Sequence, residues 1–472
     1  MRALRVRGGL RPGVPTSAWP AAGLLALVVL LVCAAPARAD EQLLTLYSPP
    51  IDSKPYVHIS KTVSLPADGV HAPSVPGSVL GFKEQVLVDS MDPDAKPLPV
   101  SKMMVHHFLY FTQGRVDGSP GGCLGSQFLT GRGEEHPDGN FEALWPAEQR
   151  ARYGVRNATE QGGAPAWLLT AMVMNHYKKP KRFYVRTKVW YTTEPRQQLY
   201  PIAVGNCDHL ANGMAYDVPG GGSVYTDRST WTVPFSGRIL GAASHHHGGA
   251  THQTLSSVSC GRPLFDARAY YGAPDHIYNT IRPILHEPGP IANGTFQSAE
   301  GVPVTAGEVL ERVAYHSDVK PHVAAMGFWV LHLVRDDGVA PCAPMPWDVR
   351  EVTKPARYDT TAPYVYDRLV PQLFAPSGRW KAASARAMTV GDQFFAPGRL
   401  TARVGQRLTW SFDGVQPHSV SVANGPRGFS SNYLGQLGGR YSFTPTVPGT
   451  YRLTCLIHPT TMSQTVRVAK RS

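Results

Sequence analysis

Short runs of alternating hydrophobic and polar residues dominate the chain. Clear examples are RLTARV (399–404), RLTWSF (407–412) and QTVRV (464–468). A period of two is typical of strands, in which successive side chains point to opposite faces. Helical periodicity is almost absent, and turns are supplied by 46 glycines and 42 prolines. The pattern predicts a nearly all-β protein whose short strands are joined by turns.

The first 39 residues follow a different pattern. Four arginines precede the apolar run AAGLLALVVLLVCAA (21–35), and ARA stands immediately before Asp40. These are the three regions of a cleavable secretory signal. We therefore expect cleavage after Ala39 and a secreted or periplasmic protein. A lipoprotein would use Cys33, but Val32 precedes it where a small residue is expected.

Charge and hydropathy narrow the range of partners. The formal charge of the 472 residues is +12, and it falls to +7 when the five arginines of residues 1–39 are removed. This surplus is spread along the chain and forms no lysine/arginine stripe, which argues against nucleic acid as a partner. No later run approaches the ~20 apolar residues of a membrane-spanning helix.

Five cysteines remain after the expected cleavage: Cys123, Cys207, Cys260, Cys342 and Cys455. An export compartment favours disulfides, and an odd number leaves one thiol free. If Cys455 is a metal ligand, the other four allow three pairings. We favour Cys123–Cys207 with Cys260–Cys342, because each bridge then stays roughly within one domain.

The free cysteine lies beside other metal-ligand residues. Cys455, His458 and Met462 form a Cys-x2-His-x3-Met loop between two predicted strands, and His418 follows an earlier turn. One thiolate, two imidazoles and a weak thioether are the donors that copper takes in blue-copper sites. The alternatives are a buried free thiol beside a surface histidine, or zinc, to which a methionine and a single cysteine are less suited.

With these four residues, the region from about residue 386 resembles the cupredoxin family. The resemblance implies a Greek-key β-sandwich with one blue copper at His418, Cys455, His458 and Met462. It also implies electron transfer with an external donor or acceptor.

The larger region before it carries histidines at the edges of apolar runs. His106 and His107 lie in MMVHHFLYF, where strand alternation turns adjacent side chains to opposite faces unless a bulge intervenes. In SHHHGG, His245 and His247 share one side of a continued strand. Each motif has a plainer interpretation: a core, surface or turn histidine, or a flexible histidine-rich loop. For Met326, in AAMGFWV, the plainer interpretation is a core residue.

The order of these motifs over about residues 60–340 resembles the copper type II, ascorbate-dependent monooxygenases, and the segments MNHYKKP and HVAAMG resemble Nod19-type secreted proteins. The first resemblance implies dioxygen, a small organic substrate and two further copper ions in two β-sandwiches. The ligands it implies are His106, His107 and a third histidine for one ion, and His245, His247 and Met326 for the other. The third histidine is assigned to His176 through the resemblance of MNHYKKP to the Nod19-type proteins, because it sits earlier relative to its strand than in the monooxygenases. Ala243, Phe328 and Val330 replace the substrate-contacting residues of the peptide-hydroxylating members, which argues against a peptidylglycine substrate.

These observations predict five segments. They are a signal peptide (1–39), two tandem β-sandwich domains of the copper monooxygenase type (40–205 and 206–345), a linker (346–385) and a cupredoxin β-sandwich (386–472). The linker would hold the cupredoxin at high effective concentration beside the larger region. The leading hypothesis is an O2-dependent copper monooxygenase with an attached electron-transfer domain. The alternatives are a non-catalytic copper-binding or electron-carrier protein, and a carbohydrate- or surface-binding β protein with an electron-transfer tail.

Overall fold

The computed structural model describes residues 41–65, 77–112, 122–125, 127–135, 147–157, 167–353, 374–384 and 387–471. The predicted signal peptide and most of the predicted linker lie outside these residues. Residues 40–472 group into one unit by their contacts. The all-β prediction is confirmed, because the described helices are short: α1 (Ala147–Arg150), α2 (Ile277–Thr280) and the 3-10 helix η1 (Cys207–Asn212). None of them is long and apolar enough to span a membrane.

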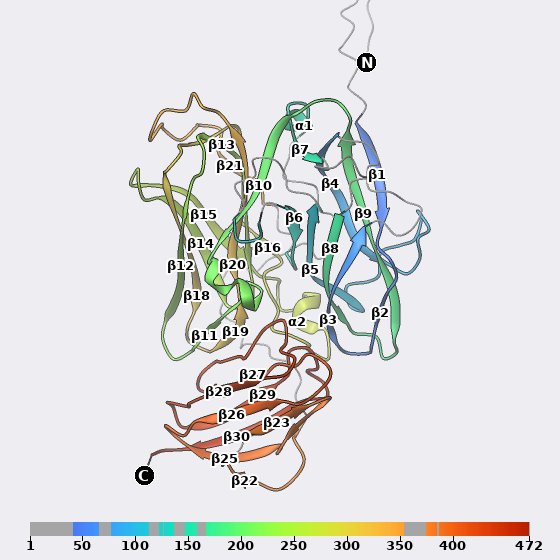
Figure 1. The fold of residues 1–472 in the computed structure, drawn as a ribbon, viewed down its shortest axis with the longest axis vertical. Coiled ribbons are helices and arrows are strands. Elements are labelled where there is room, and N and C mark those ends of the chain that lie inside the picture. Colours follow the sequence, from blue (N-terminus) through green and yellow to red (C-terminus); the bar gives the residue numbers. More distant parts are fainter. Residues whose placement is uncertain are drawn as a thin grey trace, which may run out of the picture. The chain divides into compact units, whose positions relative to one another are not determined.

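The region before the C-terminal sandwich has two halves, which are the predicted domains 40–205 and 206–345. A ten-stranded sheet runs through both of them (Figure 1). Its strands are, in order, β1 (Gln42–Tyr47), β9 (Lys181–Thr192), β4 (Gly77–Val88), β7 (Tyr153–Asn157), β10 (Gln197–Gly205), β20 (Gly327–Arg335), β13 (Gly237–His246), β17 (Thr295–Val304) and β21 (Arg350–Glu351), with β2 (Ile51–Ser53) beside β9. Parallel pairing of β7 with β10 and antiparallel pairing of β10 with β20 join the halves. The two halves therefore share one sheet.

Two further sheets complete the halves. The first is β3 (His58–Leu65), β8 (Trp167–Asn175), β5 (Met103–Thr112) and β6 (Phe128–Arg132). The second is β12 (Val224–Thr232), β18 (Val309–Ser317), β14 (Ala250–Ser257), β15 (Arg262–Tyr270) and β16 (Ala292–Asn293), and a small sheet pairs β11 (Tyr216–Val218) with β19 (His322–Ala325). One apolar core extends through both halves and includes Trp167 and Trp329, which are completely buried.

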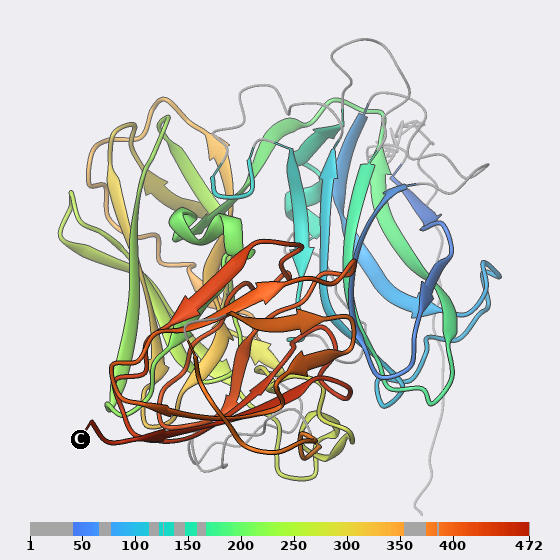
Figure 2. The ribbon, with the colours of Figure 1, turned by 60° about the horizontal axis from the view of Figure 1, so that its bottom comes forward.

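The C-terminal sandwich, orange to red in Figure 2, consists of two sheets. It has its own core around the buried Trp410. One sheet is β22 (Lys381–Ala382), β25 (Arg399–Arg403), β30 (Ser463–Ala469), β29 (Gly449–Thr454) and β27 (Ser421–Asn424). The other is β24 (Phe394–Ala396), β23 (Met388–Gly391), β26 (Leu408–Phe412) and β28 (Arg440–Phe443). The alternating runs of the sequence thus form β25, β26 and β30, with Leu400 and Trp410 directed into the core.

Two disulfides cross-link the larger region. Cys123 pairs with Cys207, and Cys260 pairs with Cys342, which confirms the favoured pairing. Cys455 is free and buried. Among the described residues it is therefore the one cysteine whose thiol is available to a metal ion.

Candidate metal centres

Three ligand-type side chains meet at one end of the C-terminal sandwich: His418, Cys455 and His458. The loop between β29 and β30 carries Cys455, His458 and Met462, as the spacing predicted. The Cys455 sulfur lies 3.9 Å from Nδ1 of His418 and 3.7 Å from Nδ1 of His458. These three side chains and that of Met462 are all buried. The three grouped donors, with Met462 on the same loop as Cys455 and His458, make this a candidate metal centre.

Neighbouring groups fix the orientation of these donors. Nε2 of His418 lies 2.9 Å from the Asp392 carboxylate, and the tautomer that donates there presents the Nδ1 lone pair toward the sulfur. Ser419 N–H donates to the sulfur at 3.3 Å. Burial raises the pKa of the Cys455 thiol, and the pKa of His458 is lowered by burial to about 4. A metal ion would bind the thiolate and expel its proton. One soft sulfur and two neutral imidazoles fit copper.

A second group of histidines begins at a bulge in β5. The register passes from Val105 opposite Val173 directly to His107 opposite Met172, so His106 is the extra residue. Both histidines are almost completely buried, and their ring centroids lie 4.2 Å apart. The bulge therefore overcomes the strand alternation that would otherwise turn His106 and His107 to opposite faces.

Two histidines from the end of β13 meet this pair. Nε2 of His107 lies 3.0 Å from Nε2 of His245 and 3.1 Å from Nε2 of His247. The ligand atoms of His106, His107 and His247 all lie within 4.8 Å of one another. His246, between the two, contacts the side-chain amide of Asn293 instead. The structure thus brings together four of the six residues expected in two separate copper sites.

The His245 and His247 rings are oriented by contacts of their Nδ1 atoms, opposite the Nε2 atoms that face His107. Nδ1 of His247 donates to the Ala324 carbonyl at 2.6 Å, and Nδ1 of His245 lies 3.1 Å from the Glu135 carboxylate. Each Nδ1 therefore carries a hydrogen, and the Nε2 of a neutral ring presents a lone pair to His107. Burial lowers the pKa of His247 to about 4 and that of His107 well below its usual value. Neutral imidazoles with converging lone pairs and carboxylate or carbonyl partners behind them are typical metal ligands.

The other two expected ligands, His176 and Met326, have different surroundings, although the Met326 carbonyl contacts His247. His176 follows β8 and is buried, with its pKa lowered by burial to about 4. Among the described residues, no hydrogen bond, ring contact or ligand-spaced group joins it to His106 or His107. Met326 is buried in an apolar cluster with Met172 and Leu456, and its carbonyl accepts from the His247 N–H at 3.3 Å.

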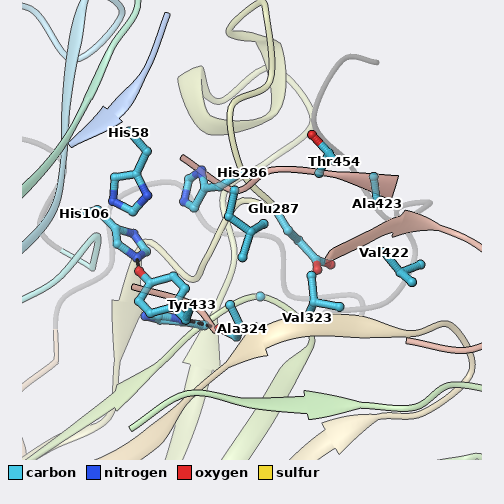
Figure 3. Close-up of a pocket in the computed structure, with 13 residues that line it drawn as sticks. His58, His106, His286, Glu287, Val323, Ala324, Val422, Ala423, Tyr433 and Thr454 are labelled. Atoms are coloured by element: carbon cyan, nitrogen blue, oxygen red, sulfur yellow. Dashed lines mark hydrogen bonds between the residues drawn. The ribbon is translucent and has the colours of Figure 1, made fainter. Parts of the chain in front are cut away.

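Four residues without a predicted role complete the cluster: His58, Glu134, His286 and Tyr433. Figure 3 shows three of them, His58, His286 and Tyr433, around His106. Glu134 contacts both His106 and His286, and the His58 and His106 rings lie 5.0 Å apart. The phenol of Tyr433, from the C-terminal sandwich, hydrogen-bonds Nε2 of His106. We name His58, His106, His107, His245, His247, His286, Glu134 and Tyr433 the histidine cluster. A lone histidine, glutamate or tyrosine carries no motif, so sequence patterns did not indicate these residues.

Two cavities border the cluster. A cavity of about 30 Å³ lies among His58, His106, His247, Tyr433 and other residues, and it has room for one or two water-sized molecules. A more open cavity of about 320 Å³ is lined by His58 and Tyr433 on one side and by His458 of the C-terminal metal centre on another. The larger cavity thus touches both candidate metal centres.

No family model and no curated protein matches the chain. Solved structures with a similar part include an oxidised mutant of amicyanin, 24% identical over 18% of this chain and 80% of that chain, with a TM-score of 0.15. The purple cupredoxin from Nitrosopumilus maritimus is 24% identical over 16% and 82%, with a TM-score of 0.14. A reduced amicyanin mutant is 27% identical over 20% and 97%, with a TM-score of 0.16. At TM-scores this low, the functional interpretation depends on the residues themselves.

Proposed function

We propose that the protein is an exported copper-dependent oxidoreductase. In this proposal the C-terminal sandwich acts as a cupredoxin, with copper at His418, Cys455, His458 and Met462, and exchanges electrons with copper held in the histidine cluster. The observation that carries the proposal is the hydrogen bond from Tyr433 to His106. This contact brings a side chain of the C-terminal sandwich against a candidate ligand of the second metal centre, which supports the proposal.

Short contacts connect the two centres. Leu456, directly after Cys455, packs in the same apolar cluster as Tyr433, whose phenol reaches His106. On a second route, the Ile457 carbonyl accepts from the backbone N–H of His58 at 3.3 Å. An electron could therefore cross within the chain, through side chains and hydrogen bonds, without a diffusing carrier.

The residues of the cluster would hold, orient and shield copper. His107 and His247 would supply neutral nitrogen donors, and the burial of the cluster would exclude bulk water. Copper held there would supply binding and reduction of dioxygen. In the monooxygenase reaction, one oxygen atom enters a C–H bond and the other leaves as water, with two electrons and two protons from an external reductant. The cavity of about 320 Å³ beside His58 and His458 has room for a small organic substrate.

A second candidate function is a copper-binding electron carrier without an organic substrate. The small cavity favours it, because the space of about 30 Å³ that touches His106 and His247 does not admit an organic molecule. The two functions differ in whether dioxygen is consumed.

The first experiment combines copper content, EPR and anaerobic pre-reduction followed by rapid mixing with O2. The oxidoreductase is expected to show one thiolate-type copper signal with additional copper, and reoxidation of the blue band with O2 consumption. Tyr433→Phe removes only the phenol hydroxyl, the group that reaches His106, and should slow this reoxidation roughly fivefold, which corresponds to a barrier raised by about 1 kcal/mol. Tyr441→Phe, in the same sandwich, is the matched control.

Three results would contradict the proposal or select its alternative. A single blue copper per chain would remove the histidine cluster from the function. Additional copper without O2 consumption would select the electron carrier. Equal reoxidation rates in Tyr433→Phe and Tyr441→Phe would exclude the Tyr433 connection as the electron route.

A further inference from the structure

Glu134 occupies an unusual position in the histidine cluster. Its side chain is almost completely buried, and its Oε1 lies against both Nδ1 of His106 and Nε2 of His286. The ligand atoms of these three residues all lie within 4.8 Å of one another. A buried carboxylate is costly unless a positive charge or a metal ion compensates it.

The surroundings hold this carboxylate in place. The Gly289 N–H donates to Oε2 at 3.0 Å, and the Tyr278 phenol donates to the Glu134 backbone carbonyl at 2.7 Å. A Cβ on Gly289 would lie 3.0 Å from Oε2, so the glycine permits this close approach. Fixing Oε2 leaves Oε1 directed at the two imidazoles, as in metal sites whose ligands are oriented by hydrogen bonds from neighbouring groups.

We propose that His106, Glu134 and His286 form a second metal site in the cluster, which takes a divalent first-row transition-metal ion. Two imidazole nitrogens and one carboxylate oxygen suit copper, zinc and iron, and affinity rises to a maximum at copper along this series. This inference rests on the proposed copper centre at His106, His107 and His247. It adds a second ion beside that centre.

Both triads contain His106, and this has a structural consequence. One ring nitrogen cannot serve two ions, so simultaneous occupancy requires Nδ1 of His106 on the Glu134 side and Nε2 on the side of His107 and His247. The Tyr433 phenol hydrogen-bonds Nε2 in this structure. With both ions bound, the phenol would stay beside that nitrogen as a neighbour of the ion instead of as a hydrogen-bond partner, so the C-terminal sandwich would still reach the cluster there. The loaded cluster would then be a dinuclear centre with His106 as its bridge.

The test measures metal content in the full chain after removal of metal, loading with Cu(II) and exhaustive buffer exchange. Wild-type protein is expected to hold three copper ions. Glu134→Gln and His286→Gln should each hold two, and the blue absorption of the Cys455 site reports that the chain is folded. His252→Gln, on β14 and outside the cluster, is the matched control and should hold three. Loading with Zn(II) and with Fe(II) measures the preference of the site.

The copper number separates this inference from the proposed function. One ion in wild-type protein would contradict the proposed copper centre as well as the second site. Two ions in wild-type protein, unchanged in Glu134→Gln, would overturn the second site alone.

Affinity and EPR provide two further readouts. Gly289→Ala keeps every ligand, but its Cβ would press on Oε2 of Glu134, and it should lower the affinity for the third ion at least tenfold. Unchanged affinity would contradict the proposed role of Glu134 as a ligand. The bridged pair should also show less EPR intensity than its Cu(II) content, and Glu134→Gln should restore that intensity. Full intensity in wild-type protein with three Cu(II) ions would exclude the bridge.

Discussion

Tyr433 and His106 are separated by 327 residues in sequence and share a buried hydrogen bond between phenol and imidazole. Burial, with Glu134 close by, raises the pKa of the Tyr433 phenol well above its usual value, so the phenol stays protonated. Burial lowers the pKa of His106 well below its usual value. A neutral phenol and a neutral imidazole therefore meet at the point where the C-terminal sandwich reaches the histidine cluster.

Asp217 holds the loop that carries Tyr433. It accepts from the Ser430 N–H at 2.6 Å and from the Ser430 hydroxyl at 2.9 Å, and the Ala324 N–H donates to the same carboxylate at 3.2 Å. Asp217→Ala should lower the free energy of unfolding by roughly 1–2 kcal/mol, because three partly buried donors lose their acceptor. It should also slow blue-copper reoxidation, because Tyr433 is less firmly placed.

Denaturant unfolding and rapid mixing check this prediction. Asp266→Asn, an exposed position on β15, is the control for loss of a carboxylate charge. An Asp217→Ala protein with wild-type stability and wild-type reoxidation would show that the loop is held by other contacts.

Asp392 should tune the copper affinity of the C-terminal site. Its carboxylate accepts from Nε2 of His418 at 2.9 Å and so fixes the tautomer that presents Nδ1 to the metal. Asp392→Asn should lower copper affinity roughly 10- to 100-fold, as for other partners of ligating histidines. Competition with a chromophoric chelator measures the change. Asp413→Asn removes a neighbouring exposed carboxylate bonded to Ser411 and should leave the copper affinity unchanged. An equal loss of affinity in both variants would show that the lost negative charge matters, and not the hydrogen bond to His418.

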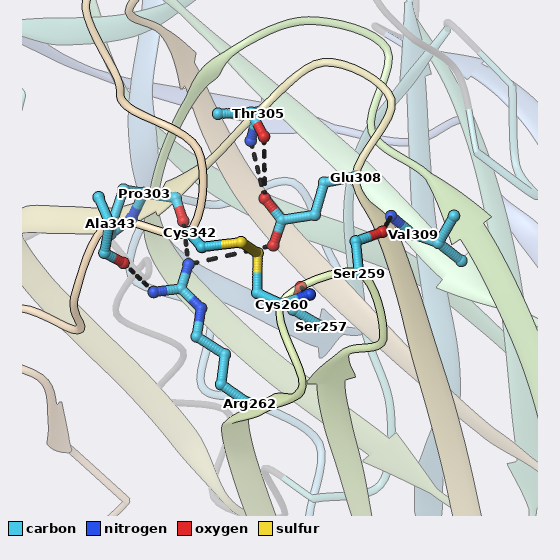
Figure 4. The surroundings of a disulfide bond; sticks show 10 residues. All are labelled: Ser257, Ser259, Cys260, Arg262, Pro303, Thr305, Glu308, Val309, Cys342 and Ala343. Atoms are coloured by element: carbon cyan, nitrogen blue, oxygen red, sulfur yellow. Dashed lines mark hydrogen bonds and ion pairs between the residues drawn. A yellow bond between two sulfur atoms is a disulfide. The ribbon is translucent and has the colours of Figure 1, made fainter.

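The disulfide between Cys260 and Cys342 should contribute to stability independently of the metal centres. It spans 82 residues, and Arg262 beside it donates to the carbonyls of Ala343 and Pro303 (Figure 4). Replacing both cysteines by alanine should lower the free energy of unfolding by roughly 2–5 kcal/mol. Urea unfolding of metal-free protein measures the loss. Copper content of the folded variant should match wild type, and a loss of copper would show that the bridge supports the cluster.

Local patterns were sufficient to indicate which candidate ligands of the C-terminal sandwich lie together, but not to indicate the histidine cluster. Cys455, His458 and Met462 lie on one short loop, so their spacing carries the information. The sequence indicated that His106 and His107 need a bulge for joint ligation, and the structure has that bulge. The meeting of this pair with His247 depends on pairing between strands far apart in the chain. Glu134 and Tyr433 reach the cluster from loops, and no local period indicates where a loop residue points.

His332 should make the fold sensitive to acid. It is buried in β20, and burial lowers its pKa to about 3. In the unfolded chain its pKa is near 6.5. Below that pH the unfolded state therefore binds a proton that the folded state does not take until about pH 3. The stability contribution is fully present above pH 6.5 and is lost as the pH falls toward 3, at about 1.4 kcal/mol per pH unit.

The measurement is the urea midpoint of metal-free protein between pH 4.5 and 7.5. His332→Gln should reduce the dependence of unfolding free energy on pH by about 1.4 kcal/mol per unit between pH 4.5 and 6.5 and leave it unchanged above, whatever it does to stability at neutral pH. Leu333→Val, at the next position in β20, changes packing without a titratable group and should shift the curve without changing its slope. Parallel curves for His332→Gln and wild type would show that His332 takes up its proton equally in the folded and unfolded states.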